Sequence, residues 1–160
     1  MKQTASLILL AALIGAAFWW LRPDYPAMPS ASLSFTDGSS DELQNWKGKP
    51  LLISFWSVSC PACRKDRPKL AQLHQVLSQR GGSVLSISMP HDPPPVIIDM
   101  VRKLAPPYPT ALDVHGELNR AFGNIEVTPT TLLINRQGKI VHRITGELDL
   151  NQVGAMLATL

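Results

Sequence analysis

The sequence predicts an α/β domain in which helices flank a mixed central sheet. Residues 51–56 form a nearly continuous apolar run, and residues 84–88 alternate apolar with small polar side chains. Each segment is followed by one with helical spacing, as expected for strands of a parallel sheet. Two more apolar runs, at residues 131–134 and 139–144, are joined by a turn at residues 135–138 that is typical of an antiparallel hairpin. A sheet that contains both kinds of pairing is mixed.

The remaining elements follow from apolar spacing and from the positions of proline and glycine. The proline-rich segment 90–95 is not expected to form a regular helix. In chain order we expect an edge strand at 33–36, a helix beginning at 40–42, the strand at 51–56, a helix from 61 to about 80, the strand at 84–88, a helix at 96–104, an extended piece at 108–113, a short helix at 116–122, the hairpin at 131–144 and a last helix at 149–160.

Length and composition exclude several classes of protein. The chain has 160 residues, enough for one domain with a short extension. A net charge of +3 is too small, and the basic residues are too dispersed, to indicate nucleic-acid binding. With only two cysteines, the chain has no disulfide framework and no second cysteine pair to complete a zinc site, so no metal site is predicted.

The N-terminus predicts export. Residues 3–21 carry no charge and lie between Lys2 and Arg22; as a helix they would reach roughly 28 Å, close to the thickness of a bilayer core. We expect a single transmembrane anchor at residues 1–22, a proline-rich linker at 23–32 and a globular domain at 33–160. A cleaved signal peptide is the alternative, because residues 15–17 resemble a small-residue cleavage site.

Both cysteines follow the strand at residues 51–56 directly. Pro61 is tolerated in the first turn of a helix, so Cys60 is expected to cap the helix N-terminus. There the unpaired N–H groups and the helix dipole favour a thiolate over a thiol. Cys60 is therefore the predicted nucleophile, and Cys63, one turn further on, is the predicted resolving thiol.

The next turn of the same helix carries Asp66. Its spacing from Cys63 and from the leucines that follow places it on the buried face of the helix. Burial would equip this carboxyl to take the proton from Cys63. The alternative is a surface aspartate paired with a neighbouring lysine or arginine. Trp56, at the end of the strand, is expected either in the core or on the floor of the active site.

Over residues 32–160 the sequence resembles the membrane-anchored, thioredoxin-like thiol–disulfide oxidoreductases of bacteria, the TlpA/ResA/DsbE group. The matching motifs are Phe35 with Asp37-Gly38, Trp46-Lys47-Gly48-Lys49-Pro50, Phe55-Trp56, Cys60-Pro61-Ala62-Cys63-Arg64, Asp66 with Pro68, Leu112-Asp113, Val127-Thr128-Pro129-Thr130-Thr131, residues 134–139 and Thr145-Gly146.

This resemblance implies a thioredoxin-like fold with Pro129 in the cis form opposite the cysteines. It also implies that the backbone of Thr128 pairs with an extended partner segment, and that Trp56, Pro61, Thr128 and Pro129 line the substrate-binding surface. Asp66 stands where the group usually has a glutamate.

The predicted function is reduction of disulfides in exported proteins, without a cofactor, by a domain on the extracytoplasmic side of the membrane. The implied partners are cysteine-containing exported proteins and a membrane electron donor. Two alternatives stay open at this point. A strongly stabilised Cys60 thiolate would make the protein an oxidant. Alternatively, Cys60 and Cys63 could bind Cu(I), with help from Met89 and His91.

Overall fold

The structure, a computed structural model, describes residues 25–158. Its elements, in chain order, are β1 (Ser32–Ser34), β2 (Ser40–Glu42), the 3₁₀ helix η1 (Leu43–Trp46), β3 (Leu51–Trp56), α2 (Pro61–Ser78), β4 (Ser83–Ser88), α3 (Pro94–Leu104), β5 (Thr110–Ala111), α4 (Glu117–Ala121), β6 (Thr130–Ile134), β7 (Ile140–Thr145) and α5 (Leu150–Leu157).

The central sheet is mixed, as predicted. Its strand order is β5-β4-β3-β6-β7; β3, β4 and β5 run parallel, whereas β6 is antiparallel to β3 and β7 is antiparallel to β6. The fully buried strand β3 therefore lies at the centre, and the segments after β3 and β4 leave the sheet at the same edge at which β6 begins. The predicted α/β fold is confirmed.

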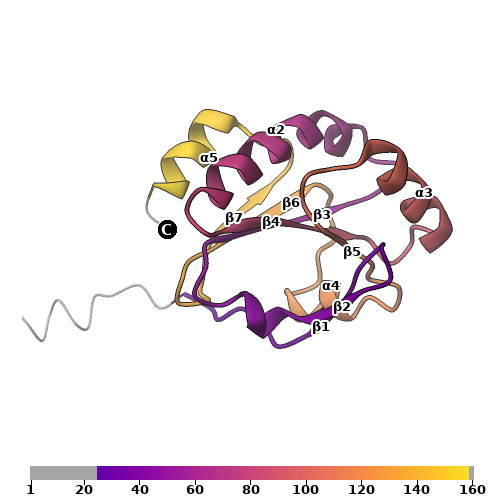
Figure 1. Cartoon of the computed structure of the whole chain (residues 1–160), viewed down its shortest axis with the longest axis horizontal. Coiled ribbons are helices and arrows are strands. Elements are labelled where there is room, and N and C mark those ends of the chain that lie inside the picture. Colours follow the sequence, from indigo (N-terminus) through magenta and orange to yellow (C-terminus); the bar gives the residue numbers. More distant parts are fainter. Residues whose placement is uncertain (1–24, 159–160) are drawn as a thin grey trace, which may run out of the picture.

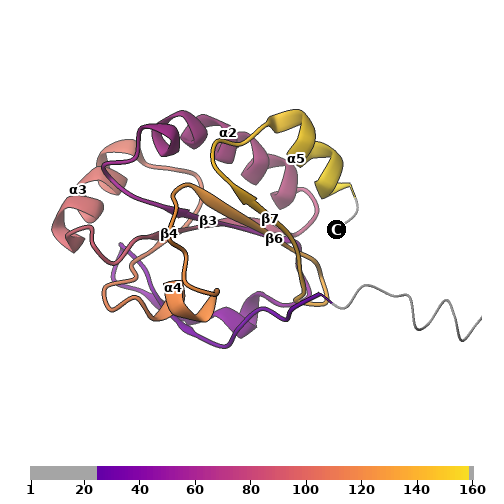
Figure 2. The same cartoon turned by 180° about the vertical axis from the view of Figure 1, so that it is seen from behind.

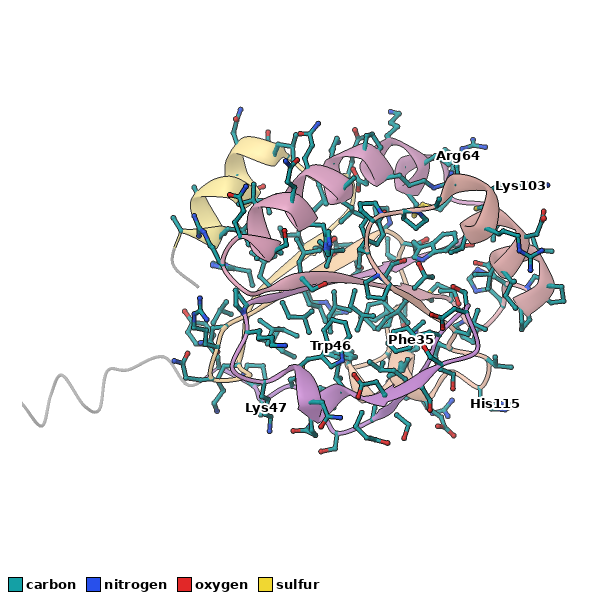
Figure 3. The ribbon with its side chains drawn as sticks, in the orientation of Figure 1. Phe35, Trp46, Lys47, Arg64, Lys103 and His115 are labelled. Atoms are coloured by element: carbon teal, nitrogen blue, oxygen red, sulfur yellow. A yellow bond between two sulfur atoms is a disulfide. The ribbon has the colours of Figure 1, made fainter. Side chains whose placement is uncertain are left out.

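Helices and the small hairpin formed by β1 and β2 cover the two faces of this sheet. This β1–β2 pair is called the hairpin, and the apolar core between it and the sheet is called the hairpin-side core. Figures 1 and 2 show α2, α3 and α5 on one face, and α4, β1, β2 and η1 on the other. Because side chains of a strand alternate between faces, Leu51, Ile53 and Phe55 pack toward the hairpin, whereas Leu52 packs against α2 and α5. Phe35 and Trp46, labelled in Figure 3, pack against the hairpin-side core.

Two local predictions are wrong. Residues 40–42 do not begin a helix: they pair with β1 as strand β2, and only the following turn is helical. The helix expected at 96–104 begins at Pro94, because proline fits the first turn, where no intrahelical N–H donor is needed. The end of the helix predicted at 149–160 lies partly outside the described residues.

Part of the segment expected to be a linker packs on the domain instead. Ala27 forms an antiparallel bridge with Lys139, and the N–H of Met28 donates to the carbonyl of Gly138 at 2.8 Å. The Met28 side chain is buried in the hairpin-side core. Met28 therefore packs as part of the domain, because one apolar side chain among the prolines has a place in the core.

The proposed membrane anchor falls on residues 1–22, outside the described residues. In the part of the chain that the structure describes, no helix has the length and apolar character needed to cross a membrane.

His74 of α2 holds the start of β4 in place. Its Nδ1 accepts the backbone N–H of Val84 at 3.2 Å, which requires an unprotonated Nδ1. Burial lowers the pKa of His74 below its ordinary value of 6.5. The unfolded chain consequently binds the proton more readily than the native chain does.

Stability should therefore be complete above about pH 6.5 and should fall as the pH drops through the lowered native pKa of His74. In His74→Asn the amide oxygen can still accept the Val84 N–H but does not titrate. We therefore compare how much the free energy of unfolding falls between about pH 8 and about pH 5 in the two proteins, measured by denaturant unfolding with the disulfide intact. The fall should be smaller in His74→Asn than in the unmodified chain. Identical losses in the two proteins would contradict the assignment.

Candidate active site

The two cysteines lie at the start of α2, as predicted, and form a disulfide. Cys60 has the extended backbone of an N-cap residue, with φ −83° and ψ 111°, and its Sγ accepts the N–H of Cys63 at 3.1 Å. Cys60 is 9% exposed, whereas Cys63 is only 3% exposed. A partner can therefore reach the sulfur of Cys60 more readily than that of Cys63.

The loop between β3 and α2 holds Cys60 in this position. The N–H of Cys60 donates to the carbonyl of Ser57 at 3.2 Å, and the Cys60 carbonyl accepts the N–H of Arg64 at 3.4 Å. In Figure 3 the yellow sulfur atoms lie near Arg64, at the first turn of α2. Since the strand is buried and its hydrogen-bond register is fixed on both sides, the end of β3 sets where the helix begins.

The segment before β6 lies across from the cysteines. The Thr128–Pro129 peptide bond is cis, and the carbonyl oxygen of Thr128 lies 3.5 Å from Cys60 Sγ. In the disulfide the sulfur has no proton to donate, so this is a contact; in the dithiol the same S–H can donate to that carbonyl. The cis form and its place opposite Cys60 agree with the resemblance.

Asp66 lies on the buried face of α2, together with Cys63. It is 1% exposed, and its two carboxylate oxygens accept the N–H of Leu148 at 3.1 and 3.2 Å. Lys69 Nζ lies 3.1 Å from Asp66 Oδ1 and donates to the Leu148 carbonyl at 2.7 Å. The alternative of an exposed aspartate is wrong, although the predicted pairing with Lys69 is present. A role as proton acceptor stays a prediction.

Lys69 also contacts Glu147, which lies near the surface, at 2.9 Å. The pKa of Lys69 is raised, chiefly by the hydrogen bond that it donates to Glu147 and then by the one that it donates to Asp66. The hydrogen bond from Lys69 in turn lowers the pKa of Glu147. This lysine is therefore protonated at neutral pH and links the second turn of α2 to the loop before α5.

A cavity of about 240 Å³ opens beside Cys63. Trp56, Asp66 and Pro129 also line it, together with apolar side chains of α3. Trp56 is 8% exposed and packs in one apolar cluster with Cys60 and Cys63. Both alternatives for this residue therefore hold: it is buried, and it lines the site. Within residues 25–158, its indole N–H finds no hydrogen-bond partner.

Two further groups border this cavity. The Arg67 guanidinium lies 5.9 Å from the centre of the Trp56 ring, and burial lowers its pKa. Burial also raises the pKa of Tyr108 to about 12, so its hydroxyl is neutral at physiological pH. The cavity thus presents apolar walls with a few polar groups, as small recognition sites commonly do.

The two additional ligands named in the copper alternative, Met89 and His91, contact other groups in the structure. Met89 packs in the hairpin-side core and its sulfur contacts Asn119, whereas Cys60 and Cys63 belong to a separate cluster with Trp56 and Ile97. His91 contacts Ser57 and Asp92.

Sequence reasoning missed Asp92. This carboxylate comes from the proline-rich segment after β4 and is 7% exposed. Its oxygens accept the Ser57 hydroxyl at 3.0 Å and the N–H of Val58 at 2.9 Å, in the loop that leads to Cys60. One signal was available: β3 and β4 are parallel, so the segments that follow them meet at one edge of the sheet.

Comparison with known proteins gives a consistent result. The family described as Redoxin matches residues 25–157. The thiol-disulfide oxidoreductase ResA of Bacillus thuringiensis is 26% identical over 125 residues, which cover 78% of this chain and 71% of that protein. ResA of Geobacillus thermodenitrificans is 25% identical over 159 residues, which cover 96% of this chain and 90% of that protein.

Solved structures show the same fold. A thiol:disulfide interchange protein of the thioredoxin family from Chlorobium tepidum has a TM-score of 0.77 at 24% identity, covering 86% of this chain and 97% of that one. StoA from Bacillus subtilis has a TM-score of 0.67 at 23% identity, covering 82% of this chain and 99% of that one.

The thioredoxin-like fold and a Cys60–Cys63 disulfide at the N-terminus of α2 agree with these relatives. The chain belongs to the redoxin family and is a ResA-like thiol–disulfide oxidoreductase of the TlpA/ResA/DsbE type.

Proposed function

We propose that this protein reduces disulfide bonds of exported proteins, with Cys60 as the attacking thiol and Cys63 as the resolving thiol. The observation that carries the proposal is the capping geometry of Cys60. Its sulfur already accepts the N–H of Cys63, and a thiolate at the same position would accept that hydrogen bond more strongly.

Two exchange steps make up the reaction. The Cys60 thiolate attacks one sulfur of the partner disulfide, which forms a mixed disulfide and releases the partner's other sulfur as a thiolate that takes up a proton. Cys63 then loses its proton and attacks the sulfur of Cys60. This step breaks the mixed disulfide and releases the second partner thiol. Two electrons have passed to the partner, and the domain is left with the Cys60–Cys63 disulfide.

We propose that Asp66 is the general base that accepts the proton of the Cys63 thiol. Asp66 lies on the same buried face of α2 as Cys63, and both residues line the same cavity. General bases act from such positions, where water is largely excluded. Lys69 and the Leu148 N–H hold the carboxylate in place.

The partner is proposed to bind across the cysteines as an extended segment. The backbone of Thr128 is the candidate for strand-like pairing, since its carbonyl already lies beside the Cys60 sulfur. Pro61, Trp56 and Pro129 are candidates to contact side chains next to the partner cysteine. The apolar cavity beside Cys63 suits an apolar side chain.

Two observations support action outside the cytoplasm. Residues 3–21 carry no charge, and the Cys60–Cys63 disulfide is of a kind that forms and persists in oxidising compartments. After each cycle the domain needs two electrons, which a membrane thiol donor can supply by the same exchange chemistry.

Replacing Cys63 with Ala in the full-length chain should trap partners, because the mixed disulfide on Cys60 can no longer be resolved. We expect covalent complexes on non-reducing gels of cell extracts, with exported cysteine-containing proteins as the trapped partners identified by mass spectrometry. Cys60→Ala is the matched control and should trap far fewer. Equal trapping by the two variants would contradict the assignment of the nucleophile, and exclusively cytoplasmic partners would contradict the proposed compartment.

The reduction potential tests the direction of electron flow. A reductase should equilibrate with glutathione buffers at roughly −200 mV or lower, closer to thioredoxin than to the strongly oxidising periplasmic enzymes near about −120 mV. A value near the oxidising end would make the chain an oxidant and overturn the proposed direction, while leaving the thiol–disulfide chemistry intact.

The variant Asp66→Asn should slow resolution of the mixed disulfide by on the order of 100-fold, because the amide cannot take the proton from Cys63. The first attack by Cys60 should change little, so stopped-flow assays should show the mixed disulfide accumulating. Glu147→Gln is a suitable control, since Glu147 also contacts Lys69 but lies near the surface. An unchanged resolution rate in Asp66→Asn would remove Asp66 from the mechanism.

A further inference from the structure

A polar cluster lies beside the loop that leads to Cys60. It consists of Ser57 and Ser59 from that loop, and of His91 and Asp92 from the segment between β4 and α3. Ser57 Oγ is at its centre, 3.0 Å from Asp92 Oδ1, 3.1 Å from His91 Nε2 and 3.2 Å from Ser59 Oγ. The reaction proposed above uses none of these four side chains.

The hydrogen-bond directions exclude a serine nucleophile in this cluster. A carboxylate can only accept, so the single proton of the Ser57 hydroxyl is donated to Asp92. His91 Nε2 must then donate to Ser57 and cannot take the hydroxyl proton as a base. What remains is a buried carboxylate whose two oxygens both hold the loop before Cys60.

The backbone makes this connection rigid. The N–H of Met89 donates to the carbonyl of Trp56 at 2.9 Å, so the chain leaving β4 is already tied to the end of β3. Beyond Asp92, three consecutive prolines have fixed φ angles, and Pro93 is the N-cap residue of α3. Ser57, in turn, accepts the N–H of Cys60 through its carbonyl at 3.2 Å.

We propose that Asp92 is a positioning residue for the redox reaction: it fixes the loop at residues 57–59, and its negative charge opposes ionisation of Cys60. This proposal rests on the proposed role of Cys60 as the attacking thiol. Destabilising the thiolate form of the dithiol makes a thiol–disulfide pair more reducing, so Asp92 shifts the protein toward reduction.

His91 acts in the opposite sense. Its Nε2 lies 3.9 Å from Asp92 Oδ1, and its side chain is mostly exposed. A positive charge there offsets the carboxylate. The experiment leaves unchanged the other ionisable residues of the elements around Cys60: Arg64, Lys65, Asp66 and Arg67 of α2, and Glu126 before the cis proline.

The test is the pH dependence of Cys60 alkylation, measured from about pH 5 to about pH 10 in the reduced full-length chain with Cys63→Ala. Adding Asp92→Asn should lower the midpoint of the titration and raise the alkylation rate below that midpoint about threefold. In the chain with both cysteines, Asp92→Asn should shift the equilibrium with glutathione toward the dithiol by a similar factor.

Asp113→Asn is the matched control. Asp113 is also a buried carboxylate that accepts two backbone N–H bonds, but it caps α4 on the hairpin side of the sheet. Its replacement should leave the titration of Cys60 unchanged.

The shape of the profile separates positioning from charge. A loosened loop would change the plateau rate at alkaline pH, whereas loss of the charge moves the midpoint. An unchanged midpoint in Asp92→Asn overturns the proposal that its charge acts on Cys60. If Asp92→Asn does not fold, His91→Lys at the exposed position takes its place, and an unchanged midpoint in that variant overturns the proposal equally.

The two proposals fail separately. If Cys60 titrates like an ordinary cysteine before Asp92 is changed, the role of Cys60 as an activated nucleophile fails. If Cys60 is activated but its midpoint is unchanged in Asp92→Asn, or in His91→Lys where Asp92→Asn does not fold, only the role of Asp92 fails.

Discussion

The hydrogen bond between Cys60 Sγ and the N–H of Cys63 is the contact on which the site depends. A helix begins with N–H groups that have no partner in the preceding turn, and here a sulfur atom rather than an oxygen accepts one of them. The same N–H can serve the disulfide and the thiolate. The site therefore needs little rearrangement to change redox state, because the acceptor stays in place while its charge changes.

Three separate segments meet around that capping contact at one edge of the sheet. The loop after β3 supplies Cys60, the segment after the parallel strand β4 supplies Asp92, and the segment before the antiparallel strand β6 supplies Thr128 and Pro129. A parallel pair places two strand ends together, and an antiparallel neighbour adds a strand start at the same point. The mixed sheet thus brings Cys60, the Asp92 carboxylate and the backbone of Thr128 to the same edge.

Much of this arrangement was predictable from residue patterns. A nearly continuous apolar run identified β3, and alternation of apolar and small polar residues identified β4. The proline after Cys60 located the start of α2. These signals are local. Burial of Asp66 was predictable because helical spacing places it under Cys63. By contrast, the pairing of residues 40–42 with β1, the packing of Met28 and the reach of Asp92 to Ser57 are contacts between distant parts of the chain. No local pattern specifies such contacts, so sequence reasoning assigned these residues to a helix start, a linker and a loop.

The electrostatic balance at Cys60 combines terms of opposite sign. The first turn of α2 favours the thiolate, as do nearby cationic side chains such as Arg64, whereas buried carboxylates oppose it. The two carboxylates near the site differ in their neighbours. Asp66 contacts the ammonium group of Lys69, which offsets much of its field, whereas the ionisable contact of Asp92 is an imidazole that is charged only when protonated. The field of Asp92 is therefore the less fully offset of the two.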